Sequence, residues 1–245
     1  MVEDKIQPKG KDTAELVRKL TAAAAKNLQS VVLYGSAASG EFRPRHSDIN
    51  ILCLLRQINP EDLGKLNDAV KWWLKKGHPA PLVFTLEELR RSAGVYAIEL
   101  TEIRSRRQIL WGEDVFDSFD IPMGLYRAQV VRELRHNLLR LRQGYMIVAG
   151  KEKAVVALMA KSSSTFALLF RHALAAMGEA PPATKQDAVE RIAALLGVPV
   201  TSFRDLFKVR SGAVRASTLD AELTFRDFLG AVSRAVDEIA QRLAS

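Results

Sequence analysis

The chain has 245 residues, of which 48% are apolar and 26% are charged, a composition typical of a soluble globular protein with one large or two small domains. Its only cysteine, Cys53, excludes an intramolecular disulfide, and the four scattered histidines argue against a structural zinc site of the Cys/His type. The polar N-terminal sequence lacks the apolar core of a signal peptide, and no window of about 18 residues is both uncharged and apolar. We therefore expect a cytoplasmic protein.

The net charge of +8 is unevenly distributed along the chain. Residues 1–118 contain 18 basic and 16 acidic residues, whereas residues 119–245 contain 18 basic and 12 acidic residues, so the second half carries +6 of the excess. Such a balance favours anionic partners such as nucleotides, nucleic acid or an acidic protein surface. A basic surface that only keeps the protein soluble explains the charge equally well.

The first half of the chain alternates between strand and helix patterns. Two nearly continuous apolar runs, residues 30–35 and 48–55, predict buried strands. A first helix is expected over residues 13–26, with Asp12 or Thr13 as its N-cap. Further helices are predicted over residues 61–77 and 86–94, and further strands over residues 81–85, 95–103 and, as a short fifth strand, 108–112. This alternation indicates an α/β or α+β domain that ends near residue 118.

From Leu125 onward the apolar patterns are helical. Helical periodicity covers residues 125–149, 153–178, 185–197 and 225–244. Thr184 and Thr224 are each followed three residues later by an aspartate, which resembles a capping box with a shorter acid. We expect four or five helices packed as a bundle. Residues 153–178 are apolar enough to suggest a membrane span, but Lys161 and Arg171 interrupt them, which favours a central bundle helix.

The stretch "VVLYGSAASGEFRPRHSDINILCLL", residues 31–55, joins two expected strands through a polar loop. Gly35 and Ser36 end the first strand, where a sharp turn lets backbone amides and a hydroxyl approach a phosphate. Asp48 begins the second run and would hold a carboxylate beside the same phosphates, where a divalent cation needs oxygen ligands. Residues i and i+2 of a strand share a face, so a second carboxylate at position 50 would complete a metal clamp. The sequence has Asn50 at that position.

These residues resemble the nucleotidyltransferase superfamily that includes polymerase beta and the aminoglycoside nucleotidyltransferases. The superfamily pattern is an apolar strand, Gly-Ser or Gly-Gly, a loop, and then Asp-apolar-Asp/Glu; the matching residues are Gly35, Ser36, Asp48 and, imperfectly, Asn50. The segment "YAIELTEIRSRRQILWGEDVF", residues 96–116, is also similar to small-molecule members of the superfamily. The resemblance covers about residues 30–118.

The resemblance implies an α+β fold, with a small mixed β-sheet nucleotidyltransferase domain over residues 1–118 and an all-α helical bundle over residues 119–245. It implies metal-dependent transfer of a nucleoside monophosphate from a nucleoside triphosphate such as ATP to a hydroxyl acceptor, which is a small molecule or a protein. The implied cofactor is Mg²⁺ or Mn²⁺. Nucleic acid is allowed as a partner but not favoured, no membrane partner is expected, and a homo-oligomer is allowed.

The resemblance also implies residue roles in catalysis and metal binding. Asp48 and Glu99 would be catalytic, and Asp48, Asn50 and Glu99 would bind the metal. The third carboxylate is expected from the strand over residues 95–103, with Glu99 as the first choice and Glu102 as the second. Odd and even positions of a strand face opposite ways, so only one of these two glutamates is expected to point into the site.

The phosphates of the nucleotide would be bound by a second set of residues. Gly35 and Ser36 would grip them through the turn, and Arg43 and Arg45 in the following loop would neutralise their charge. Three arginines after the glutamate-bearing segment are further candidates for this role: Arg104, Arg106 and Arg107. For any single arginine of these, a solvated surface position is the simpler interpretation.

Asn50 keeps one neutral carbonyl oxygen but lacks the negative charge of a carboxylate. At about 4 Å and an effective dielectric of about 20, a unit charge pair contributes roughly 4 kcal/mol, so the missing carboxylate would weaken a metal site by several orders of magnitude. Three outcomes stay open: catalysis with one metal or with a compensating acid such as Glu41, nucleotide binding without turnover, or a catalytically impaired homologue with a partner-binding, regulatory role.

A rival interpretation starts from the helix expected over residues 125–149. It carries five arginines, Arg127, Arg132, Arg135, Arg140 and Arg142, a row that would suit nucleic-acid binding. The same helix has an apolar stripe, which favours the arginines as the ordinary solvent face of a core helix.

Overall fold

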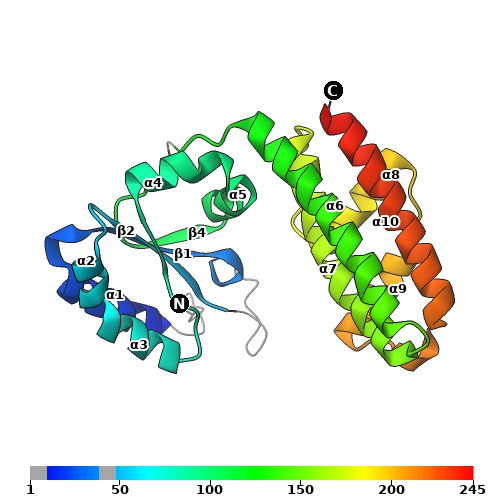
Figure 1. Cartoon of the computed structure of the whole chain (residues 1–245), viewed down its shortest axis with the longest axis horizontal. Coiled ribbons are helices and arrows are strands. Elements are labelled where there is room, and N and C mark those ends of the chain that lie inside the picture. The colour runs from blue at the N-terminus through cyan, green and yellow to red at the C-terminus, as the bar shows by residue number, and fades with distance from the viewer. Residues whose placement is uncertain (1–9, 39–47, 118, 245) are drawn as a thin grey trace, which may run out of the picture. The chain divides into compact units, whose positions relative to one another are not determined.

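The structure, a computed structural model, describes residues 10–38, 48–117 and 119–244. The chain divides into two compact units, Met1–Pro122 and Met123–Ser245, which are described in turn. Figure 1 shows the strands in the first unit and a set of long helices in the second.

The first unit contains a mixed four-stranded sheet in the order β3-β2-β1-β4. Its strands are β1 (Leu28–Tyr34), β2 (Asn50–Leu55), β3 (Leu82–Thr85) and β4 (Arg107–Gly112). β1 pairs antiparallel with both β2 and β4, whereas β2 and β3 are parallel. The helices are α1 (Gly10–Ala24), α2 (Pro60–Lys65), α3 (Asn67–Lys75), α4 (Leu86–Arg91) and α5 (Ala97–Ser105), with 3-10 turns η1 (Ala25–Asn27), η2 (Gly35–Ala37) and η3 (Ser92–Gly94).

The alternation of side chains along the strands produces two apolar clusters, one on each face of the sheet. On one face, Leu33 of β1 and Ile51 of β2 share a buried cluster with residues of α1 and α3. On the other face, Val32 and Leu52 share a cluster with residues of α4 and α5. The sheet is thus covered on both sides, which explains why β1 and β2 read as nearly continuous apolar runs.

The segment predicted as a strand over residues 95–103 is helix α5, so that prediction is wrong. Ala97, Leu100 and Ile103 are the buried residues of α5. Their spacing of three is the period of a helix face, and alanine, leucine, glutamate and arginine are good helix formers. The fourth strand of the sheet is β4, where only a short fifth strand was expected.

Two helix boundaries also differ from the prediction. α1 already includes Gly10, so Asp12 and Thr13 lie inside the helix and do not cap it. The helix expected over residues 61–77 is divided at Leu66 into α2 and α3. Gly64 lies just before this division, and glycine has low helix propensity.

The second unit contains five helices in the part of the chain that the structure describes, which agrees with the four or five expected. They are α6 (Met123–Val148), α7 (Glu152–Ala176), α8 (Lys185–Leu196), α9 (Thr201–Ser211) and α10 (Ala221–Ala244), together with the 3-10 turn η4 (Ala216–Thr218). Helix α9 is not among the segments predicted from periodicity.

Helix α7 is the central helix of this unit. By length and composition alone it is long and apolar enough to cross a membrane. It packs against α6, α8, α9 and α10, and its buried residues include Phe166 and Phe170. Its buried His172 lies with Nδ1 2.8 Å from the hydroxyl oxygen of Tyr126 on α6. These contacts are those of a bundle core.

The two predicted caps of this unit have different outcomes. Thr184 caps α8, because its hydroxyl accepts a hydrogen bond from the N–H of Asp187 at 3.1 Å. Thr224 lies inside α10, so its assignment as a cap is wrong. The residue before α10, Asp220, accepts the N–H of Leu223 at 3.0 Å instead. An aspartate is as good an N-cap as a threonine, and it stands at the earlier position.

Candidate functional site

The end of β1 turns sharply at Gly35. Its φ of +78° lies in the left-handed region, which explains why a glycine stands there. The N–H of Gly35 donates to the carbonyl oxygen of Arg106 at 3.1 Å, which ties the turn to the segment between α5 and β4. The next two N–H groups, of Ser36 and Ala37, begin the 3-10 turn and have no acceptor within it. A ligand at this turn would therefore meet those two amides rather than that of Gly35.

The pairing of β1 with β2 brings Gly35 and Asn50 together. Tyr34 and Asn50 are directly opposite each other in the register, so the residue after Tyr34 lies beside the first residue of β2. A Cβ atom built on Gly35 would lie 3.4 Å from the Nδ2 atom of Asn50. The Asn50 side chain thus lies over the glycine turn.

Asp48 precedes β2 on the same side as Asn50. Ile49, between them, is 2% exposed and belongs to the apolar cluster shared with α1 and α3. Because neighbouring residues of an extended segment alternate, Asp48 and Asn50 point toward the opposite face. Asp48 is exposed and Asn50 is half-buried. This arrangement gives one carboxylate and one amide oxygen near the glycine turn.

Tyr34 is a neighbour that sequence reasoning missed. The register places it opposite Asn50 of β2 and opposite Arg107 of β4, and directly opposed residues share a face of the sheet. Burial raises the pKa of the Tyr34 hydroxyl, so this group is a neutral donor at physiological pH. The only signal in the sequence was the alternation along β1, which does not reveal its partners.

Arg107, one of the arginines considered for phosphate binding, is held by a carboxylate of its own unit. Its Nε and Nη2 atoms donate to Asp114 at 2.8 to 3.0 Å, and its guanidinium carbon lies 6.0 Å from the centre of the Phe116 ring. The guanidinium holds the pKa of Asp114 below its usual range. Arg107 is therefore engaged in fixing the segment after β4. Glu41, Arg43 and Arg45 lie outside the described residues, as does the side chain of Ser36.

Glu99 and Glu102 lie on α5 and not on a strand. Residues i and i+3 of a helix are neighbours on one side, so the expectation that these two glutamates face opposite ways is wrong. Glu99 is exposed and Glu102 is half-buried. Among residues 10–38, 48–117 and 119–244, no group of three or more histidine, cysteine, aspartate or glutamate residues is arranged to hold a metal ion. The structure thus does not bring these glutamates and Asp48 into one such group.

The oxygen atoms of Asp48 and Asn50 suit a cation only when the phosphates of a bound nucleotide also coordinate it. Mg²⁺ in nucleotide sites is usually held by one or two carboxylates together with the phosphates of the substrate, and several waters complete its octahedron. Asp48 supplies one carboxylate, and Asn50 supplies one neutral oxygen. This set suits a cation shared with a triphosphate and is too small for a site made of protein ligands alone.

No family model matches the chain, and no curated protein sequence matches it. Among solved structures, it is similar to spectinomycin adenyltransferase from Enterococcus faecialis, which was solved with ATP and spectinomycin. The two chains are 13% identical, with a TM-score of 0.51, and the match covers 96% of this chain and 99% of that chain. The chain has a nucleotidyltransferase fold.

This nucleotidyltransferase fold includes the C-terminal helices, because the match extends over nearly the whole of both chains. The prediction of an α+β fold, a small mixed sheet followed by an all-α region, is confirmed. Of the site residues predicted from the sequence, Gly35 and Ser36 lie in the turn after β1, Asp48 and Asn50 lie just before and at the start of β2, and Glu99 lies on α5.

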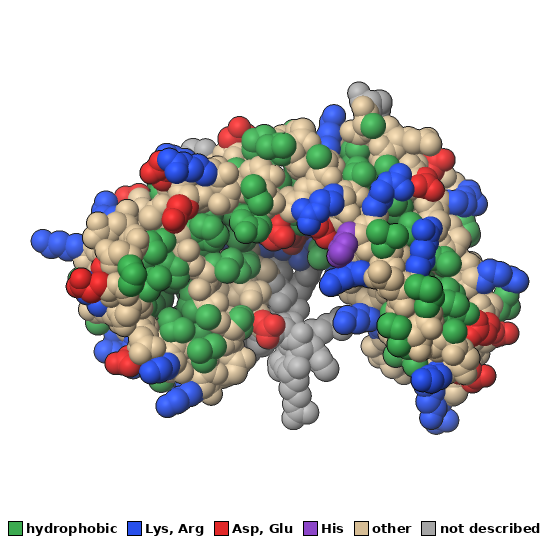
Figure 2. Space-filling view, viewed as in Figure 1, with side chains coloured by type: hydrophobic (Ala, Val, Ile, Leu, Met, Phe, Trp, Pro, Cys, Tyr) green, Lys and Arg blue, Asp and Glu red, His purple; other side chains and the backbone are tan. Residues whose placement is uncertain are grey.

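The α6 arginines of the nucleic-acid interpretation mostly have partners within the helical unit. Arg135 pairs with Asp237 at 3.1 Å, Arg132 pairs with Glu133 at 3.6 Å, Arg127 donates to the carbonyl oxygen of Ala176 at 3.1 Å, and Arg142 donates to Ser233 at 3.5 Å. On the face drawn in Figure 2, basic side chains of the helical unit are spread among acidic and apolar ones. Four of these five arginines thus have a hydrogen-bond or ion-pair partner within the helical unit.

Proposed function

We propose that the protein transfers the nucleoside monophosphate of ATP to a hydroxyl group of a small molecule. The observation that supports this proposal lies at one end of the sheet. There the left-handed turn at Gly35 lies beside Asn50, and Asp48 lies on the same face as Asn50. The structural neighbour with the same fold carries ATP and spectinomycin. We therefore infer that this turn binds a nucleotide and that the acceptor is a small molecule.

The two parts of the chain have separate roles in this proposal. Residues 1–118 are the nucleotidyltransferase-like domain, which binds the nucleotide, and residues 119–245 are the C-terminal helical bundle domain. Gly35 and Ser36 bind the phosphates of ATP, with the N–H groups of Ser36 and Ala37 and the Ser36 hydroxyl as donors. Arg43 and Arg45 neutralise part of the triphosphate charge.

Asp48 and Asn50 would hold Mg²⁺ or Mn²⁺ together with the triphosphate. Glu99, the third metal ligand predicted from the sequence, does not form a metal-holding group with Asp48 among the described residues, so the phosphates supply the remaining oxygens here. When bound, the cation supplies charge neutralisation on the phosphates and fixes their orientation. Asn50 keeps the cation site one charge short of a two-carboxylate clamp. We therefore expect measurable cation binding only when nucleotide is present, because the phosphates supply the missing oxygens.

Glu99 is the proposed general base, with Glu102 on the same side of α5 as the second candidate. The carboxylate accepts the proton of the acceptor hydroxyl as the oxygen attacks the α-phosphorus. The new bond joins the acceptor oxygen to phosphorus, and the bond from the α-phosphorus to the bridging oxygen of pyrophosphate breaks. Positioning and charge neutralisation account for most of the catalysis of phosphoryl-type transfer, so the protein needs few reactive groups.

Four chains test this proposal: the wild type, Asp48→Asn, Asn50→Asp and the matched control Asp68→Asn, which removes an exposed carboxylate from α3. Pyrophosphate release from ATP is measured with Mg²⁺ or Mn²⁺ and a panel of hydroxyl-bearing small molecules that includes spectinomycin. We expect release by the wild type and the control, an increase in Asn50→Asp, and a loss of at least about 100-fold in Asp48→Asn.

Two results would count against the proposal in different ways. If Asn50→Asp releases pyrophosphate and the wild type does not, the natural protein is a catalytically impaired homologue with a nucleotide-binding or partner-binding role. Release that is unchanged in Asp48→Asn would show that this carboxylate, and hence the proposed site, does not carry the reaction.

A further inference from the structure

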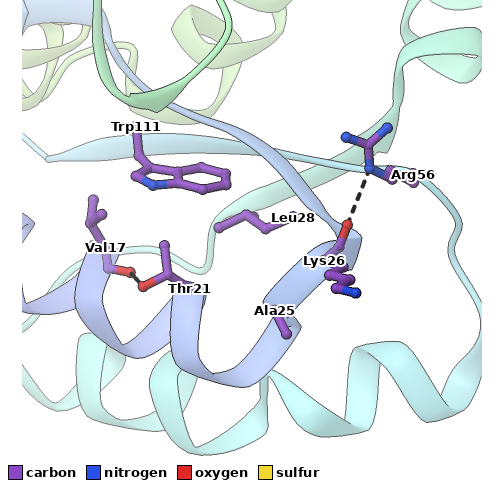
Figure 3. A pocket seen from close by; sticks show the side chains of 7 residues that line it. All are labelled: Val17, Thr21, Ala25, Lys26, Leu28, Arg56 and Trp111. Carbon is purple, nitrogen blue, oxygen red and sulfur yellow. Dashed lines mark hydrogen bonds between the residues drawn. The ribbon is translucent and has the colours of Figure 1, made fainter.

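The first unit has an open hollow of about 760 Å³ at the other end of β1 from the glycine turn. It is lined by residues from three separate segments: Val17, Thr21, Ala25, Lys26, Leu28, Arg56 and Trp111. Figure 3 shows the Trp111 ring over α1, with Leu28 between it and the basic residues. We call this site the Trp111 hollow. Its volume is in the range of small-molecule sites.

One side of the Trp111 hollow is apolar and aromatic. Leu28 is 2% exposed and forms part of its buried wall, while Trp111 on β4 remains 38% exposed. Thr21 does not add a free donor, because its hydroxyl already donates to the carbonyl oxygen of Val17 at 2.9 Å. An exposed indole face beside aliphatic side chains is suited to stacking with a flat ring.

The other side is cationic and fixed in place. The Nε atom of Arg56 donates to the carbonyl oxygen of Lys26 at 3.1 Å, and the backbone N–H of Arg56 donates to Asn27 at 2.9 Å. Asn27 also exchanges two side-chain hydrogen bonds with the backbone of Gln57, at 3.0 and 3.1 Å. These bonds hold the guanidinium on the rim, and among the described residues only its Nε atom has a hydrogen-bond partner.

Neither cation of the rim is in an ion pair among the residues that the structure describes. Several other basic residues of this unit do have a carboxylate partner; examples are Arg18 with Glu15, Lys76 with Asp12 and Arg107 with Asp114. Among the lining residues of the hollow there is no acid. Two positively charged side chains on one rim, without a carboxylate partner among the described residues, favour an anionic ligand.

The chain also bends sharply at Ala25, the residue before Lys26. Ala25 has a φ of +45°, and it is the only described residue other than glycine with a positive φ. Left-handed backbone is unfavourable for a residue with a Cβ atom. This bend ends α1 and starts the 3-10 turn from which the carbonyl group of Lys26 meets Arg56.

We propose that the Trp111 hollow binds a small planar aromatic molecule that carries a phosphate or carboxylate group. The ring stacks on Trp111, and the anionic group is bound by Lys26 and Arg56. The hollow is distinct from the proposed transferase site: Leu28 in its wall lies seven residues before Gly35, about 23 Å of extended chain, and Trp111 is opposite Val31, four residues before Gly35. Trp111 and α1 also lie on the face of the sheet opposite to Asp48 and Asn50.

The indole N–H signals in a two-dimensional NMR spectrum of the full chain labelled with nitrogen-15 test this proposal. The chain has three tryptophans, and single substitutions assign the signal of Trp111. AMP is the probe with a phosphate group, 2-naphthoate is the probe with a carboxylate group, and adenosine is the neutral probe. We expect AMP or 2-naphthoate to shift the Trp111 signal with a dissociation constant below about 10 mM, and adenosine to bind at least about 5-fold more weakly than AMP.

Matched variants separate this site from the proposed transferase site. Lys26→Gln should weaken binding at least about 5-fold, whereas Lys71→Gln, an exposed lysine of α3, and Asp48→Asn should leave the Trp111 titration unchanged. The proposal is overturned if neither anion shifts the Trp111 signal, if Lys26→Gln binds as the wild type does, or if Asp48→Asn abolishes the shift. It stands or fails independently of pyrophosphate release.

Discussion

Three glycines of the first unit have the same backbone conformation in different surroundings, and their replacement by alanine tests the geometry of the site. The φ values are +78° for Gly35, +83° for Gly77 and +81° for Gly112. Alanine in this region costs about 1 to 2 kcal/mol at each position. A Cβ on Gly77 meets no atom within 4 Å, and one on Gly35 meets only the Asn50 amide at 3.4 Å. We expect these two variants to lose about 1 to 2 kcal/mol of unfolding free energy.

Gly112→Ala should lose considerably more, because its Cβ would lie 2.2 Å from the carbonyl oxygen of Gln29. That oxygen belongs to the backbone of β1, so relief requires the strands to separate, at a further cost of about 1 to 3 kcal/mol. The measurement is urea unfolding followed by tryptophan fluorescence. Trp72, Trp73 and Trp111 all lie in the first unit, so the transition reports that unit alone.

The relative losses of stability in the three variants test the geometry of the turn at Gly35. If Gly35→Ala is as destabilising as Gly112→Ala, the space above Gly35 is smaller than the structure describes, and Asn50 is packed against the turn. If Gly35→Ala has no effect while Gly77→Ala does, the left-handed turn at the end of β1 is wrong.

Three other predictions concern stability and reactivity. Arg107→Met should lower the free energy of unfolding by about 0.5 to 1 kcal/mol at pH 7. Because Arg107 holds the pKa of Asp114 below its usual 3.8, this loss should be present above about pH 4 and should disappear as the pH falls through the lowered pKa of Asp114 in the folded protein. Urea midpoints measured across this pH range test the prediction. Burial raises the pKa of the Cys53 thiol to about 12, so iodoacetamide at pH 8 should modify it only after unfolding, and rapid modification of the native protein would contradict this burial. Arg242→Met should lower the stability of the helical unit by about 0.5 kcal/mol, measured by circular dichroism, because Arg242 donates to the carbonyl oxygen of Leu195 at the end of α8 at 3.2 Å.

The buried strands were predictable because they are covered on both faces. β1 and β2 lie almost where the apolar runs 30–35 and 48–55 predicted them. The glycine turn was predictable too, since few residues other than glycine adopt its backbone conformation. The segment over residues 95–103 was not, because a short run with Val95, Tyr96 and isoleucines suits either a strand or a buried helix.

The remaining features depend on contacts between distant segments. The pairing of Tyr34 with Asn50 and with Arg107 follows from strand register, which neither strand specifies alone. The Trp111 hollow combines parts of α1, η1, β1 and β4 with Arg56, the residue after β2, so no local motif marks it. Asp48 and Asn50, in contrast, are only two residues apart, and their shared face follows from the period of a strand.

The central claim is that this chain attaches a nucleoside monophosphate to a hydroxyl group. Mass spectrometry of the acceptor after incubation with ATP and Mg²⁺ or Mn²⁺ measures that bond directly. We predict an acceptor heavier by one adenosine monophosphate unit with the wild type and with Asp68→Asn, and at least about 100-fold less of this product with Asp48→Asn. Equal amounts of product with and without the Asp48 carboxylate would contradict the account, as would an unmodified acceptor panel with both the wild type and Asn50→Asp under saturating ATP.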